Sequence, residues 1–246
     1  TSRDWGRNTA LHAPTLPPLH KRHPSPFWIE SRFPMQQTSF NAEHPNALVF
    51  CADENVLPYA LFAASHAATL NPDRNFDILI CSLTPLTLSD YFRDLGIIPV
   101  HLDLGDHMRA QNLTVKRLTL TSYLRLWLPE HFADIYERIF YVDTDTDIVD
   151  RNLSDFSRLD LGTHAIGGVR DIAQWTHINR PIHEFDIRKM PGGAYLNAGV
   201  LLIDTEEYNR RDFLARMLET NRTMAPFIHN DQSLINLTLR HEWAEL

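Results

Sequence analysis

The stretch ALVFCADENVLP (Ala47–Pro58) begins the first regular structure that can be read from the sequence. Its apolar first half is typical of a buried strand, and the polar residues and proline that follow are typical of the first turn of a helix. We expect that helix to end near Leu70. Strands at Phe76–Leu83 and Ile98–Leu104, with a helix over residues 84–96 between them, continue the alternation. This order predicts an α/β fold with a mostly parallel sheet that is covered by helices.

The second half of the chain is expected to extend the same sheet. An apolar periodic segment, Leu120–Phe132, precedes a strand at Arg138–Asp143. A long irregular segment is expected from Arg170 to Gly193. The remaining predicted elements are strands at His164–Val169 and Ala194–Asp204, a helix over residues 206–221 and a last helix from about Asp231.

Composition and charge narrow the class of protein. The 246 residues are 43% hydrophobic and 22% charged, which is typical of a soluble globular protein. No apolar run approaches the roughly 18 residues of a membrane-spanning helix, which leaves only peripheral membrane association open. The net charge of −8 argues against a nucleic-acid partner, because phosphate backbones are bound mainly by clustered Lys and Arg.

The two cysteines indicate the cellular compartment, and the composition of the first 45 residues indicates a domain boundary. Cys51 and Cys81 each lie in a strand-like apolar run and are expected to be buried thiols, as in the reducing cytoplasm. Residues 1–45 contain seven of the fifteen prolines and no periodicity, so we expect an extended arm or linker there. Residues 46–246 are expected to form a single domain.

The acidic run YVDTDTDIVD (Tyr141–Asp150) follows a predicted strand. Alternation along an extended chain sends Asp143 and Asp145 to the same side, at the strand end where open α/β sheets bind ligands. Two such carboxylates suit a hard cation, Mn²⁺ or Mg²⁺, that also binds a phosphate. Taken alone, such a run is more often a solvated acidic turn. A calcium loop is excluded because Ile148 and Ser154 stand where such a loop needs Gly and Glu.

Four parts of the sequence, in this order, resemble the glycosyltransferases of family 8, which include bacterial lipopolysaccharide hexosyltransferases and glycogenin-like enzymes. The parts are FCADENV (Phe50–Val56), TSYLRLWLPE (Thr121–Glu130), YVDTD (Tyr141–Asp145), and the pair YLNAGVLLID (Tyr195–Asp204) and NDQSLIN (Asn230–Asn236). The resemblance covers about residues 47–240. It implies a GT-A fold, a Rossmann-like mixed sheet in which a divalent metal holds a nucleoside diphosphate sugar. Residues 46–246 would then be the catalytic domain.

The resemblance also implies binding roles for residues outside the acidic run. Asp53 would meet the uracil edge, Asn55 the ribose, and Arg125 the diphosphate or the sugar. Asp171 would bind sugar hydroxyls, and Gly199 would permit close approach of the donor. Taken alone, Asn55 is as readily a helix cap. Arg125 would more commonly be a surface residue on an amphipathic helix, and Gly199 can instead mark only a bulge.

The catalytic residues implied by the resemblance are Asn197, Asp231 and Gln232. Asn197 offers an amide to the donor sugar, and the Asp231-Gln232 pair would lie beside the anomeric carbon. Without the resemblance, Asn230-Asp231 would be interpreted as a helix cap. Many bacterial members have a second Asp where this chain has Ser233, which weakens any covalent mechanism there.

The family pattern continues past Leu246 to an element that supplies a His metal ligand and a Lys to the diphosphate. The sequence in hand ends before it, so we expect a fragment or a natural truncation. The segment from Arg170 to Gly193, with Trp175, His177 and His183, is a candidate lid that faces the acceptor.

The reaction implied is transfer of glucose or galactose from its UDP derivative to a saccharide or other hydroxyl acceptor, with retention of configuration and assistance from Mn²⁺. Two other functions remain open from the residues: a non-catalytic domain that binds nucleotide sugars or carbohydrates, and a metal-dependent phosphohydrolase that uses the acidic run.

Overall fold

A computed structural model describes residues 40–115, 119–149, 151–175, 177 and 179–246. Most of the predicted arm, residues 1–39, lies outside this range. Residues 40–45 are in contact with the domain. The Phe40 ring packs against Phe132 and Tyr136, and the Glu43 N–H donates to Asp77 Oδ2 over 3.1 Å.

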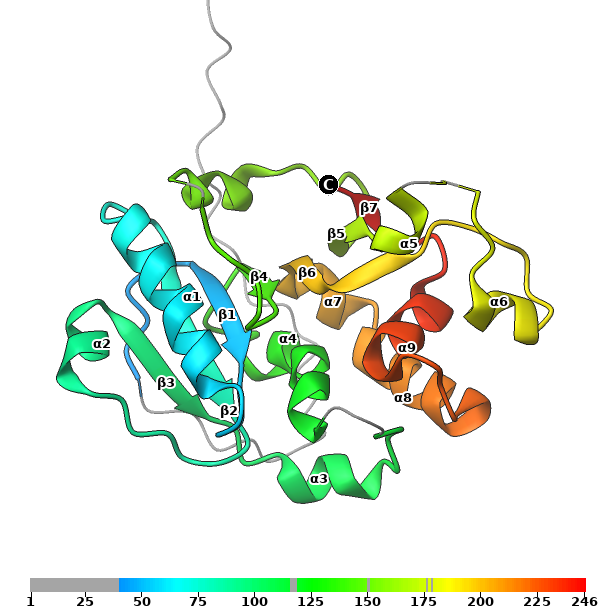
Figure 1. Cartoon of the computed structure of the whole chain (residues 1–246), viewed down its shortest axis with the longest axis horizontal. Helices are drawn as coiled ribbons and strands as arrows, with labels where there is room; N and C mark the ends of the chain where they lie inside the picture. Colours follow the sequence, from blue (N-terminus) through cyan, green and yellow to red (C-terminus); the bar gives the residue numbers. More distant parts are fainter. Residues whose placement is uncertain (1–39, 116–118, 150, 176, 178) are drawn as a thin grey trace, which may run out of the picture. The chain divides into compact units, whose positions relative to one another are not determined.

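The described residues form a seven-stranded mixed sheet in the order β3-β2-β1-β4-β6-β5-β7 (Figure 1). Strands β1 to β4 are parallel to one another, and β6 runs antiparallel to its neighbours β4 and β5. The strands are β1 Asn46–Cys51, β2 Asp77–Ser82, β3 Ile97–His101, β4 Arg138–Val142, β5 Ile166–Arg170, β6 Leu196–Asp204 and β7 Ala244–Glu245. The predicted α/β class with a mostly parallel sheet is confirmed.

Helices cover both faces of this sheet, so its central strands are buried throughout. In β1, Ala47, Val49 and Cys51 join one hydrophobic cluster, and the alternate residues Leu48 and Phe50 join the other. This explains why β1 and β2 read as continuous apolar runs and not as an alternation with polar residues.

Helix α1 (Leu57–Leu70) lies along one face of the sheet, next to β1, β2 and β3 (Figure 1). Its buried side chains are all alanines, which allow close approach of the helix to the strands. The other helical elements are α2 Asp90–Asp94, α3 Gly105–Ala110, the 3₁₀ helix η1 Leu120–Leu126, α4 Leu128–His131, the 3₁₀ helix η2 Leu153–Arg158, α5 Ile172–Trp175, α6 His183–Ile187, α7 Thr205–Arg210, α8 Phe213–Met224 and α9 Asn230–Leu239. None of the described helices is long and apolar enough to cross a membrane.

Several helix predictions were wrong in extent. The helix predicted for 84–96 is confined to α2, because Ser89 is extended and Leu88 turns into the core. The helix predicted for 206–221 is two helices, since Asp212 takes a left-handed conformation (φ 51°) between α7 and α8. The segment predicted to be irregular, 170–193, contains the short helices α5 and α6.

Because β6 runs antiparallel to its neighbour β4, three chain segments meet at the C-terminal edge of the parallel strands. The ends of β1 and β4 lie at this edge, and so does the beginning of β6, because β6 runs in the opposite direction. Helix α9 is almost entirely buried and packs against β6. The Asn236 side chain fixes this contact: its Oδ1 accepts from Leu196 N–H and its Nδ2 donates to Leu196 O, both over 2.7 Å.

Replacing Asn236 by Ala should lower the free energy of unfolding by about 2–6 kcal/mol, because two buried backbone groups of Leu196 lose their partner at roughly 1–3 kcal/mol each. Urea denaturation measures this. The control is Thr223→Ala, an exposed position whose hydroxyl bonds only to carbonyls of its own helix, where the change should stay within about 0.5 kcal/mol. Equal losses in the two variants would contradict the assigned role of Asn236.

Candidate active site

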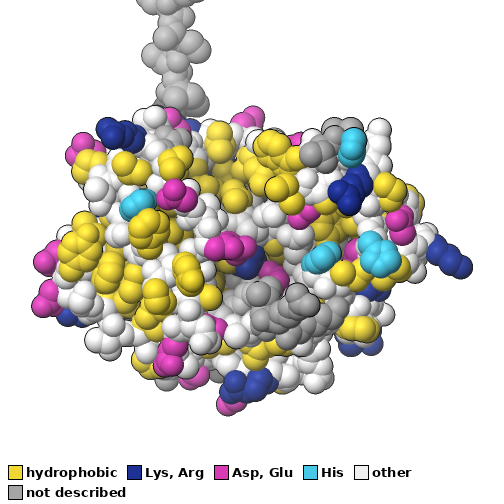
Figure 2. Space-filling view, viewed as in Figure 1, with side chains coloured by type: hydrophobic (Ala, Val, Ile, Leu, Met, Phe, Trp, Pro, Cys, Tyr) yellow, Lys and Arg dark blue, Asp and Glu magenta, His cyan; other side chains and the backbone are white. Residues whose placement is uncertain are grey.

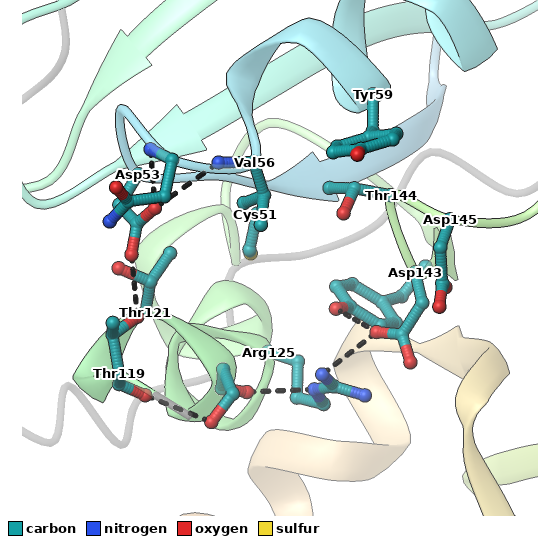
Figure 3. A pocket seen from close by; sticks show the side chains of 13 residues that line it. Cys51, Asp53, Val56, Tyr59, Thr119, Thr121, Arg125, Asp143, Thr144 and Asp145 are labelled. Atoms are coloured by element: carbon teal, nitrogen blue, oxygen red, sulfur yellow. Dashed lines mark hydrogen bonds and ion pairs between the residues drawn. The ribbon is translucent and has the colours of Figure 1, made fainter. Parts of the chain in front are cut away.

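A pocket of about 590 Å³ opens at the edge where β1 and β4 end. We call it the edge pocket. It is lined by Cys51, Asp53, Asn55, Val56, Tyr59, Thr119, Thr121, Ser122, Arg125, Tyr141, Asp143, Thr144 and Asp145 (Figure 3). Five of the residues predicted to bind donor or metal are therefore in its wall: Asp53, Asn55, Arg125, Asp143 and Asp145.

Arg125 is the buried cation of the edge pocket, with 5% of its surface exposed. Its Nη2 lies 2.8 Å from Asp143 Oδ1, and its Nε lies 3.0 Å from Asp231 Oδ2. The Nε–H donates to Ser122 O, and Nη1 donates to Ala198 O. The guanidinium also lies 4.3 Å above the centre of the Tyr141 ring. Arg125 therefore joins η1 to β4, β6 and α9, and the interpretation of it as a surface residue is wrong.

The charges around Arg125 compensate for its burial. Burial by itself lowers the pKa of Arg125, but Asp231, Tyr141 and Asp143 together raise that pKa above its usual value. Burial raises the pKa of Asp231, and the charge of Arg125 opposes that rise. We conclude that Arg125 is a permanent cation paired with carboxylates.

Asp143 is held in one orientation by its neighbours. Its Oδ1 accepts a hydrogen bond of 2.7 Å from the Tyr141 hydroxyl in addition to the ion pair with Arg125. Its Oδ2 lies over Gly199, where an added Cβ would come within 2.6 Å of that oxygen. The absence of a side chain at Gly199 thus leaves room for the carboxylate, and Asp143 Oδ2 is the oxygen that remains for a ligand.

The carboxylates of Asp143 and Asp145 could supply some, but not all, of the ligands of a divalent cation. Asp145 is exposed and lines the edge pocket with Asp143 (Figure 3). Among the residues that the structure describes, no group of three His, Cys, Asp or Glu side chains could hold a metal ion. Two carboxylates nevertheless suit Mg²⁺ or Mn²⁺, which are commonly bound by one or two carboxylates together with substrate phosphates and water.

The other end of the edge pocket is organised by Asp53. Its Oδ1 accepts from the Asn55 N–H over 2.9 Å, and its Oδ2 accepts from the Thr119 hydroxyl over 2.8 Å (Figure 3). The N-cap of α1 is Val56, so the interpretation of Asn55 as a helix cap is wrong. The Asn55 side chain is exposed and lines the pocket.

Gln232, Asp171, Asn197 and Gly199 meet beside the edge pocket. Gln232 Oε1 accepts from the Ala198 N–H over 3.1 Å, and its Nε2 donates to Asp171 Oδ2 over 2.9 Å. Asn197 Oδ1 accepts from the Gly199 N–H over 2.8 Å. Asp231 is only 3% exposed and faces Arg125. All ten predicted site residues thus fall in one region, although Asp231 is enclosed within it.

Residues with clear contacts in this region were missed from the sequence. Tyr141 could have been found, because it lies two positions before Asp143 on a strand and so points to the same side. No sequence pattern indicated Thr119, because Asp53, which it contacts, is 66 residues away in the chain. Cys51 was recognised as a buried thiol but not as a pocket residue. Burial raises its pKa to about 12, so it is neutral and a poor nucleophile at physiological pH.

Comparison with known proteins identifies the family of the chain. The family model described as glycosyl transferase family 8 matches residues 47–246. The chain belongs to glycosyl transferase family 8. Membership confirms the family that the sequence resembles.

Two curated relatives of this family 8 chain come from streptococci. The probable glycosyl transferase Gly of Streptococcus gordonii is 27% identical over 130 residues, and glycosyltransferase GlyA of Streptococcus pneumoniae is 26% identical over 130 residues. Each match covers 52% of this chain but 17% and 16%, respectively, of the relative. The matched part is therefore a small portion of those longer proteins.

Solved structures show that the fold is shared. The galactosyltransferase LgtC, crystallised with donor and acceptor sugar analogues, is 24% identical and has a TM-score of 0.56 over 78% of this chain and 70% of its own. The bifunctional glycosyltransferase WbbM is 16% identical and has a TM-score of 0.61 over 83% of this chain and 39% of its own. The predicted GT-A type of fold is confirmed.

Gly199→Ala should displace the Asp143 carboxylate and lower the free energy of unfolding of this family 8 chain by about 1–3 kcal/mol, the usual cost of overpacking. The comparison is Gly192→Ala, where no atom lies within 4 Å of the added Cβ and little change is expected. Urea denaturation of both variants measures the difference. Equal stability of the two would show that the approach of Asp143 to Gly199 imposes no constraint.

Proposed function

We propose that this chain moves glucose or galactose from a UDP-sugar to a hydroxyl group of a saccharide or other acceptor, with retention of configuration. The edge pocket is the observation that carries the proposal. It has a hydrogen-bonding carboxylate, Asp53, at one end and a pair of carboxylates, Asp143 and Asp145, at the other, with the Arg125 cation in its wall. A volume of about 590 Å³ falls within the range of sites for cofactors and drug-sized molecules.

The donor would lie with its base toward Asp53 and Asn55 and its diphosphate toward Asp143 and Asp145. Asp53 supplies a carboxylate for the base, and Asn55 an exposed amide for the ribose. A bound Mn²⁺ or Mg²⁺, held by Asp143 and Asp145, would supply Lewis-acid stabilisation of the phosphate charge. The sugar would then be near Asp171, Asn197 and Gln232, which lie beside the diphosphate end.

Arg125 and Asp231 would act mainly by positioning. The Arg125 guanidinium already binds two carboxylates and two carbonyls, so its first role is to hold Asp143 in place. Asp231 balances that charge from α9. Gln232 would stand nearest to the reacting carbon, with its amide fixed by Ala198 and Asp171.

Retention by same-face attack is proposed because each candidate nucleophile of the protein is already paired or is neutral. Asp231 is paired with Arg125, the Ser233 hydroxyl donates to Glu184 over 2.6 Å, and the Cys51 thiol is neutral. In the proposed step the bond from the anomeric carbon to the phosphate oxygen breaks. The acceptor oxygen bonds to that carbon on the same face, and its proton passes to the departing phosphate.

A cytoplasmic location is part of the same proposal. Cys51 and Cys81 occupy paired positions on β1 and β2, and both are free buried thiols. Neighbouring thiols of this kind are in keeping with a reducing compartment.

Calorimetry with UDP, with and without Mn²⁺, followed by assays of UDP-glucose and UDP-galactose hydrolysis, tests the proposed function. We expect Mn²⁺-dependent binding of UDP and release of UDP from at least one donor. Binding without turnover would favour a non-catalytic nucleotide-sugar domain. Release of phosphate from simple phosphate esters would instead favour a phosphohydrolase.

Asp143→Asn and Asp145→Asn should each weaken Mn²⁺-dependent UDP binding at least about tenfold, or roughly 1.4 kcal/mol, because an amide lacks the charge that favours a hard cation. Asp147→Asn is the matched control from the same acidic run. Asp147 is exposed, pairs with His66 at 3.3 Å and does not line the edge pocket. Calorimetric titration of UDP at fixed Mn²⁺ measures the three affinities. Parental affinity in both Asp143→Asn and Asp145→Asn would remove them as metal ligands.

A further inference from the structure

Trp175 is a large aromatic side chain that is exposed but held in one orientation. Its surface is 72% exposed, and its indole Nε1–H donates to Arg170 O over 2.9 Å. The polar group of the indole is therefore satisfied within the protein. What faces water is the flat apolar ring, whose exposure gains nothing from hydrogen bonding with solvent.

The same hydrogen bond ties Trp175 to the peptide between Arg170 and Asp171, and Asp171 is one of the residues proposed to lie near the donor sugar. Asp171 Oδ1 accepts from the Ala173 N–H at the start of α5, and Asp171 Oδ2 accepts from Gln232. The indole is thus linked to Asp171 through the Arg170–Asp171 peptide, and Asp171 is linked to Gln232 by a hydrogen bond.

The strand that leads to this turn is fixed on its other side. The Arg170 side chain forms two hydrogen bonds with Glu245, of 2.6 and 2.8 Å. Asp171 is in turn joined to Tyr195 by a backbone hydrogen bond of 2.8 Å. The ring therefore rests on a turn whose backbone is held from both sides, as a binding platform requires.

Other exposed aromatic side chains of the described residues have different surroundings. Tyr59, Phe62 and Tyr91 belong to α1 and α2, where hydrophobic side chains gather on the face shown in Figure 2. Of these, Tyr59 lines the edge pocket, at the end proposed for the donor. Trp175 does not line that pocket and belongs to α5, which begins directly after Asp171. Its position suits the second substrate and not the nucleotide.

We propose that Trp175 is a stacking platform for a saccharide acceptor, an inference that rests on the proposed function and names the class of the second substrate. The face of a pyranose ring that carries C–H groups is flat and apolar, and it complements the electron-rich face of an indole. Stacking on Trp175 would leave the hydroxyl groups at the rim of the sugar free to turn toward Asp171 and Gln232. An acceptor without such a face, such as a short alcohol, gains nothing from the ring.

The test follows the indole N–H resonance of Trp175 by NMR in ¹⁵N-labelled protein with UDP and Mn²⁺ present. The probes are lactose, p-nitrophenyl β-galactoside and p-nitrophenyl β-glucoside. Trp175→Phe assigns the resonance among the five tryptophans of the chain. We expect at least one probe to shift the Trp175 resonance saturably, and Trp175→Ala to raise the Kd of that probe about tenfold through the lost apolar contact. Trp175→Phe should retain most of the affinity.

Tyr91→Ala is the control, because it removes an exposed aromatic ring on α2 and should leave the Kd unchanged. An unmoved Trp175 resonance with all three probes, or equal Kd values in Trp175→Ala and the parent, would overturn the platform. UDP binding in the same samples separates this inference from the proposed function. Saccharide binding at Trp175 without UDP binding would support the platform and count against the donor site. UDP binding with no shift of the Trp175 resonance would support the donor site and count against the platform.

Discussion

The buried ion pairs of Arg125 are the constraint on which the site depends. A guanidinium taken out of water is tolerated when its charge and its N–H groups are matched, and here Asp143, Asp231 and two backbone carbonyls match them. These partners come from the residue that follows β4 and from α9, η1 and β6. The burial of Arg125 therefore requires that all four elements be in place around it.

The same contacts prepare the pocket for its ligand. Tyr141 and Arg125 occupy one oxygen of Asp143, and Gly199 leaves space for the other. The antiparallel course of β6 matters here because it brings the beginning of that strand to the edge where β1 and β4 end. A parallel strand in that position would have carried Gly199 to the opposite edge of the sheet.

Local patterns predicted the part of the site that depends on local geometry. The strand before Asp143 and the alternation of residues predicted that the acidic run lies at the C-terminal edge of the parallel strands, and the structure has it there. The meeting of Asp171 with Gln232 could not be derived from spacing, because it depends on how α9 packs against β6; the family resemblance supplied both residues. Local propensity also failed to predict two features that depend on tertiary contacts. The left-handed Asp212 divides a predicted helix in two, and β7 forms only by pairing with the distant β5. The interpretation of Asn55 as a helix cap was wrong because the Asp53 side chain accepts the backbone hydrogen bond in this turn.

A double-mutant cycle measures whether Arg125 and Asp231 stabilise the site as a pair. The free energy of unfolding in urea is measured for the parent, Arg125→Met, Asp231→Asn and the double variant. We expect Arg125→Met alone to cost about 3–5 kcal/mol, because it leaves a buried carboxylate unpaired, and the addition of Asp231→Asn to recover part of that loss. A coupling energy of at least about 1 kcal/mol would support the account. Additive effects of the two substitutions would contradict it.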